Sequence, residues 1–118
     1  MEEQIDVLLA TYNGEKYLKE QIDSILNQTY KNIKLIISDD CSTDKTVEIL
    51  KEYESRDDRI ELYLQQQNLG VVKNIEFLLN KVKCPYYMLA DQDDYWMPEK
   101  IEKSFETLKE KKSRFSIW

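Results

Sequence analysis

Apolar residues along the chain follow two alternating periods. Runs of mostly apolar residues at 5–10, 34–38 and 86–90 are each followed by polar residues, which is typical of buried strands. A fourth run, 60–65, alternates apolar and polar residues, and it predicts a strand exposed on one side. Between the runs, apolar residues recur every three or four positions, which indicates amphipathic helices. The helical stripes are Leu18, Ile22, Ile25 and Leu26; Val47, Ile49, Leu50 and Tyr53; Val71, Ile75, Leu78, Leu79 and Val82; and Ile101, Phe105 and Leu108.

This alternation of strands and helices predicts the fold class. Strands separated by helices of this length are typical of βαβ units, so we expect an α/β, Rossmann-like fold whose mostly parallel sheet has helices on both faces. Ser42, Thr43 or Asp44 is expected to cap the second helix, and Pro98 to begin the fourth. A fifth strand is expected to start at 114–118, where the chain stops, so the sheet is expected to be cut off.

The composition of the 118-residue chain excludes several classes of protein. The length fits one domain. The net charge of −6 argues against a nucleic-acid-binding protein, which needs a basic face. No apolar run approaches the roughly 20 residues of a membrane span, and the acidic start MEEQID is unlike a signal peptide. Two separate cysteines, Cys41 and Cys84, without an export signal indicate a reducing, cytoplasmic location.

Histidine and glycine are the informative absences. The chain has no histidine, which excludes Ser/His and Cys/His dyads and the usual zinc sites, so acid–base chemistry must use carboxylates, lysine or tyrosine. It has only two glycines, Gly14 and Gly70, so it contains neither a GxGxxG fingerprint nor a P-loop. A phosphate-containing ligand would therefore need another source of positive charge.

Polar side chains gather where three of the predicted strands end. Thr11 and Tyr12 follow the first strand, Asp39 and Asp40 follow the second, and the DQDD run at 91–94 follows the fourth. Ligands of open parallel sheets bind outside the carboxyl ends of the strands. This edge is therefore the candidate site, provided that the first, second and fourth strands are close in the sheet.

The acidic run at 91–94 is a candidate metal site. If the extended geometry of the strand continues, Asp91 and Asp93 project to the same side, roughly 6–7 Å apart. That spacing allows a divalent cation to sit between them, and the lack of histidine and of paired cysteines favours Mg²⁺ or Mn²⁺. The alternative is that Asp91 ends the strand while Asp93 and Asp94 form an Asx-turn or a cap.

Three other polar residues at this edge each allow two interpretations. Asp39 stands where a Rossmann-type fold holds a nucleoside, or it begins a turn. Tyr12 can stack on a base or pack against the protein. Lys73, in NLGVVKN, is the only cation beside a helix N-terminus that can help to hold an anion, or it is an ordinary solvated lysine.

Three segments together resemble a known family. The N-terminal half of family 2 glycosyltransferases, which have the GT-A fold, is similar in order and spacing to VLLATYNGEKYLKEQIDSILNQTYKNIKLIISDDCSTDKT, NLGVVKN and YYMLADQDDYWMPEKI. The last segment matches the DxD motif of that family. The resemblance covers nearly the whole chain. It implies that residues 1–118 are the nucleotide-sugar (donor) binding part of the enzyme, without the acceptor-binding half.

The resemblance implies a metal-dependent donor site. Asp93, the second acid of the DxD motif, would be the principal ligand of Mn²⁺ or Mg²⁺ on the diphosphate of a UDP- or dTDP-sugar. Asp91 would approach the ribose or assist the metal. Asp94 receives no role.

The same resemblance implies a pocket for the base of the nucleotide. Thr11 and Tyr12 would line it, Tyr12 by stacking, and Asp39 would accept a hydrogen bond from the base. Lys73 would approach the diphosphate, at a position where many relatives have arginine.

The resemblance also limits the activity expected of this chain. The catalytic base of the family lies in an acidic motif further downstream, so no catalytic residue is assigned here, and the chain alone is expected to be inactive. The full enzyme is expected to be an inverting transferase that acts on a polysaccharide or lipid-linked acceptor in the cytoplasm, near the inner face of the cell membrane. Contact with the membrane would come only from sequence that this chain lacks.

Other classes of protein fit the residues less completely. A module that binds a nucleotide diphosphate without catalysis would use the same side chains. An aspartate- and Mg²⁺-dependent phosphotransfer domain has acids at the end of the first strand, where this chain has ATYNG. A sugar nucleotidyltransferase needs a glycine-rich opening loop, and only Gly14 is there.

Overall fold

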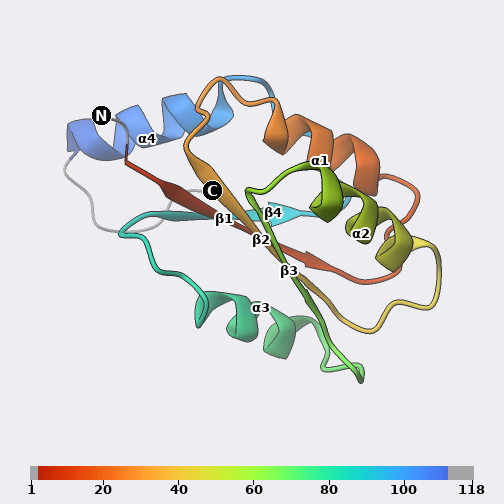
Figure 1. Cartoon of the computed structure of the whole chain (residues 1–118). Coiled ribbons are helices and arrows are strands. Elements are labelled where there is room, and N and C mark those ends of the chain that lie inside the picture. Colours follow the sequence, from red (N-terminus) through yellow and green to blue (C-terminus); the bar gives the residue numbers. More distant parts are fainter. Residues whose placement is uncertain (1–2, 112–118) are drawn as a thin grey trace.

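The computed structural model describes residues 3–111, and these residues fold in the predicted order of elements (Figure 1). The elements are β1 (Ile5–Thr11), α1 (Leu18–Leu26), β2 (Ile33–Asp39), α2 (Thr46–Arg56), β3 (Ile60–Leu64), α3 (Val71–Leu79), β4 (Tyr87–Asp91) and α4 (Lys100–Lys111). The fifth strand predicted at 114–118 lies outside the described residues. Within the described part of the chain, none of the helices is long and apolar enough to span a membrane.

The four strands form one parallel sheet in the order β3-β2-β1-β4. The central strand β1 therefore pairs with β2 on one side and β4 on the other. In register, Thr11 of β1 lies opposite Asp39 of β2, and Ala10 lies opposite Asp91 of β4. The carboxyl ends of these three strands consequently meet at one edge, as the sequence predicted.

The two faces of the sheet are covered unequally. Helices α1, α2 and α4 lie on one face, and α3 lies alone on the other (Figure 1). Because successive side chains of a strand point to opposite faces, Val7 and Leu9 of β1 belong to the larger core under the three helices. Leu8 points the other way and packs with Ile36 and Leu78 in a small second cluster. The prediction of helices on both faces is confirmed.

Helix α3 differs from its predicted stripe. Only Asn74 and Leu78 are buried in it, whereas Val71 is 71% exposed and Leu79 is 39% exposed. The helix also ends before Val82. A helix forms here as predicted, but it is shorter than the predicted stripe and buries only part of it. The reason is that no second described helix lies beside α3, so α3 can bury only the side that contacts β1 and β2.

Candidate functional site

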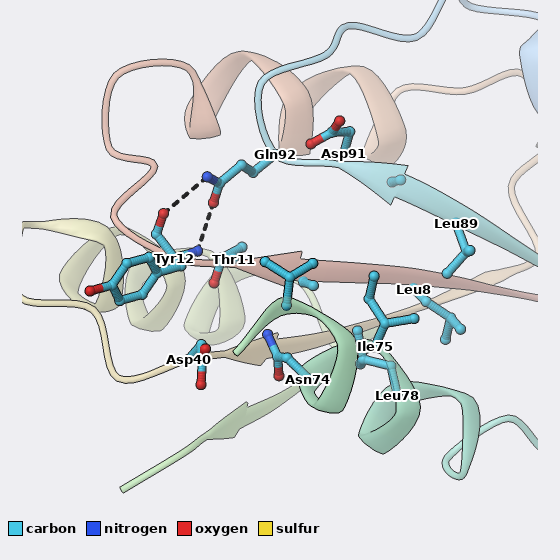
Figure 2. Close-up of a pocket in the computed structure, with 13 residues that line it drawn as sticks. Leu8, Thr11, Tyr12, Asp40, Asn74, Ile75, Leu78, Leu89, Asp91 and Gln92 are labelled. Carbon is cyan, nitrogen blue, oxygen red and sulfur yellow. Dashed lines mark hydrogen bonds between the residues drawn. The ribbon is translucent and has the colours of Figure 1, made fainter. Parts of the chain in front are cut away.

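A cavity of about 370 Å³ opens at the carboxyl edge of the sheet, between β1, β4 and α3 (Figure 2). Its inner wall is apolar and comes from the second cluster beside α3. Its mouth is polar and includes Tyr12, Asp40, Asp91 and Gln92. Thr11 and Asn74 complete the polar part. A ligand here would meet an aromatic ring, carboxylates and amides at the mouth, with hydrocarbon behind them.

The loop that follows β1 is fastened to the loop that follows β2. The backbone N–H of Asn13 donates to Ser42 Oγ at 2.9 Å, and the N–H of Gly14 donates to Thr46 Oγ1 at 2.9 Å. In return, Asn13 Oδ1 accepts the Thr43 N–H at 2.8 Å. Asn13 has a φ of 45°, a left-handed conformation that asparagine tolerates better than most residues. These bonds hold Tyr12, which is 44% exposed, at the mouth of the cavity.

Helix α2 begins without a side-chain cap on its N-cap residue, Lys45. Of the three predicted caps, Asp44 accepts the backbone N–H of Thr46 at 2.9 Å, while Ser42 and Thr43 contact Asn13 instead. Burial alone would raise the pKa of the Asp44 carboxyl, but hydrogen bonds from Thr46 and from the backbone outweigh burial and lower it.

Asp39 bonds to the protein itself and does not line the cavity. Its Oδ1 accepts the hydroxyls of Thr11 and Ser42, each at 2.6 Å, and its Oδ2 accepts the Ser42 N–H at 2.9 Å. Only 1% of Asp39 is exposed. Asp39 and Thr11 therefore stabilise the junction of β1 with the β2–α2 loop.

Asp40, the next residue, does line the cavity. Its carboxylate accepts the backbone N–H groups of Leu69 at 2.6 Å and Gly70 at 2.9 Å, so it ties the end of β2 to the loop before α3. Gly70 has a φ of 92°, a conformation that favours glycine. Lys73 is exposed on the first turn of α3 and does not line the cavity.

The acidic run after β4 forms a tight turn. The backbone N–H of Asp94 donates to the carbonyl of Asp91 at 3.1 Å, so the chain reverses as soon as the strand ends. The prediction that extended geometry continues from Asp91 to Asp93 is therefore wrong, because this hydrogen bond closes the turn. The turn nevertheless brings the carboxylates together. Partial burial, the charge of Asp93 and a hydrogen bond with Asp93 raise the pKa of Asp91, and the charge of Asp94 adds to this.

These carboxylates fit a divalent cation as a two-ligand site. Among residues 3–111, no group of three or more His, Cys, Asp or Glu side chains is placed to hold a metal ion. Asp91 and Asp93 are exposed, and both supply the hard oxygen atoms that Mg²⁺ and Mn²⁺ prefer. Mg²⁺ sites commonly use one or two carboxylates and take their other ligands from phosphate oxygens and water.

Buried polar side chains of α1 hold the backbone of the acidic turn. Gln21 is 0% exposed, and its Nε2 donates to the carbonyl of Asp91 at 2.6 Å. Ser24 Oγ accepts the N–H of Trp96 at 3.0 Å and donates to Gln21. Gln28, just beyond the end of α1, is also 0% exposed. A polar face of α1 thus points into the protein, opposite to what its amphipathic pattern indicates for polar residues.

Gln28 extends this contact to the start of α4. Its Nε2 donates to the carbonyl of Met97 at 2.7 Å, and its Oε1 accepts the N–H of Ile101 at 2.9 Å. The segment between the acidic turn and α4 is therefore fixed by its backbone groups. Pro98 lies in this segment, two residues before the helix, and its carbonyl accepts the N–H of Thr29 at 2.9 Å.

The sequence did not identify four residues that shape the site. Asp40 stands next to Asp39, and Asn74 is the last residue of NLGVVKN, but neither position indicates a role. Asn74 is buried and joins α3 to β2 by two bonds to Ser38. Gln21 and Gln28 carry one signal that was available, because they are polar residues three or four positions from the apolar stripe of α1.

The chain is similar to known proteins along nearly its whole length. The family model described as glycosyl transferase family 2 matches residues 6–117. A putative teichuronic acid biosynthesis glycosyltransferase of Bacillus subtilis, TuaG, is 34% identical over 96% of this chain, which spans 45% of that protein. The glycosyltransferase GlyA of Streptococcus pneumoniae is 34% identical over 99% of this chain, which spans 17% of that protein. The chain thus covers less than half the length of these relatives.

Solved structures agree with this assignment. Staphylococcus aureus TarS in complex with UDP superposes with a TM-score of 0.81 and 26% identity, over 91% of this chain and 32% of that one. A mannosyltransferase of Pyrobaculum calidifontis, solved with GDP-mannose and Mn²⁺, superposes with a TM-score of 0.83 over 92% of this chain and 33% of that one; at 18% identity it shows the fold alone. These neighbours have the GT-A fold, and this sheet has the same architecture. The chain belongs to glycosyltransferase family 2.

Proposed function

We propose that this chain is the donor-binding part of a glycosyltransferase and binds a nucleotide-diphosphate sugar together with Mn²⁺ or Mg²⁺. One observation carries the proposal. The cavity mouth joins Tyr12 and Asp40 to Asp91, and Asp91 belongs to a turn that brings its carboxylate close to that of Asp93. One end of this edge suits a base and the other suits a metal-bound diphosphate. TarS, which is similar to this chain, was solved with UDP and with UDP-GlcNAc, and this supports the same class of ligand.

The base is proposed to bind at the Tyr12 end. The exposed ring of Tyr12 offers a stacking surface, and base–aromatic stacking contributes about 1–3 kcal/mol. The sequence predicted Asp39 as the acceptor for the base. Asp39 bonds to Thr11 and Ser42, whereas Asp40 reaches the cavity. We therefore assign the acceptor role to Asp40 and a supporting role to Asp39 and Thr11.

The diphosphate is proposed to bind at the acidic turn. Asp93 and Asp91 would hold the divalent cation, and Lys73 would approach the diphosphate from the first turn of α3. A bound divalent cation neutralises the charge of the departing nucleoside diphosphate. The chain's own contribution is to present the two carboxylates on a turn whose backbone is already fixed by α1.

The wider reaction is also a proposal. We place the catalytic base and the acceptor site in sequence beyond this chain, because the chain spans less than half of its relatives. The full enzyme is proposed to invert the anomeric centre and to act on a polysaccharide or lipid-linked acceptor at the cytoplasmic face of the membrane. The teichuronic acid role in the name of TuaG supports a polymeric acceptor.

Calorimetry tests the donor site. UDP and dTDP are titrated into the chain with and without Mn²⁺, in the wild type, in Asp93→Ala and in a control, Asp58→Ala. Asp58 is exposed in the turn before β3, at the opposite edge of the sheet. We expect Mn²⁺-dependent binding of UDP that Asp93→Ala abolishes and Asp58→Ala preserves. Equal binding without metal, or no binding by the folded wild type, would contradict the metal-dependent site.

A further inference from the structure

Gln92, the middle residue of the DxD motif, joins the loop that contains Tyr12 to the acidic turn. We infer that Gln92 is a positioning residue, which holds the Tyr12 loop at a fixed separation from the acidic turn so that one nucleotide diphosphate contacts both. The inference rests on the proposed function. It adds a specific role for Gln92, a residue of the cavity mouth, through its contact with the Tyr12 backbone.

Gln92 uses both ends of its amide on one residue. Its Oε1 accepts the backbone N–H of Tyr12 at 2.8 Å, and its Nε2 donates to the carbonyl of Tyr12 at 3.0 Å (Figure 2). The pairing of β1 with β4 ends at Ala10 and Asp91. The side chain of Gln92 therefore continues the β1–β4 ladder beyond the last pair of strand residues, in the way that a further peptide group would.

Gly14 makes room for this amide. A Cβ atom at position 14 would lie 2.4 Å from Gln92 Oε1 and 2.6 Å from its Cδ, closer than real Cβ contacts. The left-handed residues of the described chain are Asn13, Cys41 and Gly70, so the backbone conformation does not require a glycine at 14. The close approach of Gln92 does require it. Gln92 thus makes the contact with the Tyr12 backbone, and Gly14 leaves the space for it.

The acidic turn is held from its other side as well. Gln21 donates to the carbonyl of Asp91, the residue that precedes Gln92. Because α1 already fixes the turn, the bonds from Gln92 locate Tyr12 relative to a stationary group. Groups that are fixed before a ligand binds lose less conformational entropy on binding, and this strengthens the binding of a ligand that spans them.

The contact can be broken from either side, which gives a double-mutant cycle. Gln92→Ala removes the amide, and Gly14→Ala displaces it. The Kd values of UDP and of inorganic pyrophosphate are measured with the same divalent metal in both single variants, in the double variant and in a control, Gln67→Ala, an exposed residue of the β3–α3 loop. Urea denaturation of every variant separates a loss of folding from a loss of binding.

A positioning role has a specific signature. We expect each single variant to weaken UDP binding by about tenfold, within the usual range for coupled sites, and to change pyrophosphate binding less than about twofold. Pyrophosphate is insensitive because it engages only the acidic turn. Gly14→Ala should add nothing in the Gln92→Ala background, because the atom that it displaces is already gone.

Three results would overturn the inference. If Gln92→Ala binds UDP as tightly as the wild type, Gln92 positions nothing. If UDP and pyrophosphate weaken equally, Gln92 acts on the acidic turn alone. If the folded wild type binds pyrophosphate with metal but UDP no more tightly, there is no joint site, and the proposed function fails along with the inference.

Discussion

The two acidic segments at the carboxyl edge of the sheet are held in opposite ways. After β2, the carboxylates themselves hold the chain, because Asp39 accepts bonds from Thr11 and Ser42, and Asp40 accepts backbone N–H groups of the loop before α3. After β4, neighbouring side chains hold the backbone: Gln21 fixes the carbonyl of Asp91. The carboxylates of the acidic turn are consequently exposed and close to one another.

This difference separates two kinds of acid. Asp39 and Asp40 hold the chain, although Asp40 also lines the cavity, whereas the acids of the turn after β4 are exposed. Further along the β2–α2 loop, partial burial would raise the pKa of Asp44, but hydrogen bonds from Thr46 and from the backbone lower it. In the second segment partial burial and the charge of Asp93 raise the pKa of Asp91. A cluster of like charges without a counterion is a cost to folding that a bound cation would remove.

The largest expected effect comes from removing a holding carboxylate. Asp39→Ala leaves the hydroxyls of Thr11 and Ser42 and one buried N–H without their acceptor. We expect the free energy of unfolding to fall by about 3 kcal/mol, because hydrogen bonds to a buried carboxylate are strong and the donors would be left without a partner. Urea denaturation measures this, with Asp93→Ala as the matched control. Asp93→Ala should stay within about 0.5 kcal/mol of wild type, as is usual for exposed sites. If the two variants lost equal stability, Asp39 would not differ from Asp93 in holding the chain.

Removing the hydrogen bonds from Gln28 to the segment between the acidic turn and α4 should have the next largest effect on stability. Gln28→Leu preserves the approximate volume but leaves the Met97 carbonyl and the Ile101 N–H without a partner in a buried site. We expect a loss of about 2 kcal/mol in urea denaturation. Gln66→Leu, at an exposed position of the β3–α3 loop, is the matched control. If both variants lose equally little stability, Gln28 does not support the segment between the acidic turn and α4.

Local patterns predicted the elements and the edge where the site lies. The spacing of the apolar residues predicted the correct order of strands and helices. This works because the buried face of a helix or strand determines which positions are apolar. The parallel βαβ connection then brought the ends of three strands together. These features could be predicted from the sequence because they depend on residues that are near one another in it.

The roles of individual acids depend on details that no local pattern contains. Neighbouring residues at a strand end point in different directions, so the exact end of β2 decides whether Asp39 or Asp40 meets the cavity. The contact of Gln92 with Tyr12 joins residues 80 positions apart. Gln21 of α1 and the nearby Gln28 were hard to recognise as buried, even though they stand close to the apolar stripe, because a polar residue in an amphipathic helix normally indicates the solvent face.

A smaller, pH-dependent effect is expected at Asp44. The pKa of Asp44 is lower in the folded state than its ordinary value of 3.8, so its charge stabilises the fold above that value, and the contribution is lost as the pH falls through the folded pKa. Asp44→Asn retains an acceptor for the Thr46 N–H but removes a charge beside the first turn of α2. We expect it to lower the free energy of unfolding at pH 7 by less than about 1 kcal/mol. Denaturation at pH 2 should show no difference, and a difference that persists there would contradict the electrostatic origin.

The smallest expected effect is a gain in stability instead of a loss. It tests most directly whether the carboxylate of Asp91 differs from that of Asp39. Asp91→Asn removes one of the repelling charges of the acidic turn, so in the absence of metal we expect unfolding at neutral pH and low salt to become harder by a few tenths of a kcal/mol. This gain should shrink in 0.5 M salt, since salt screens exposed charges. Saturating UDP and Mn²⁺ should reverse the order, because the wild type gains stability from binding that the variant lacks. If Asp91→Asn instead destabilised the ligand-free protein as Asp39→Ala is expected to, its carboxylate would belong with those that hold the chain.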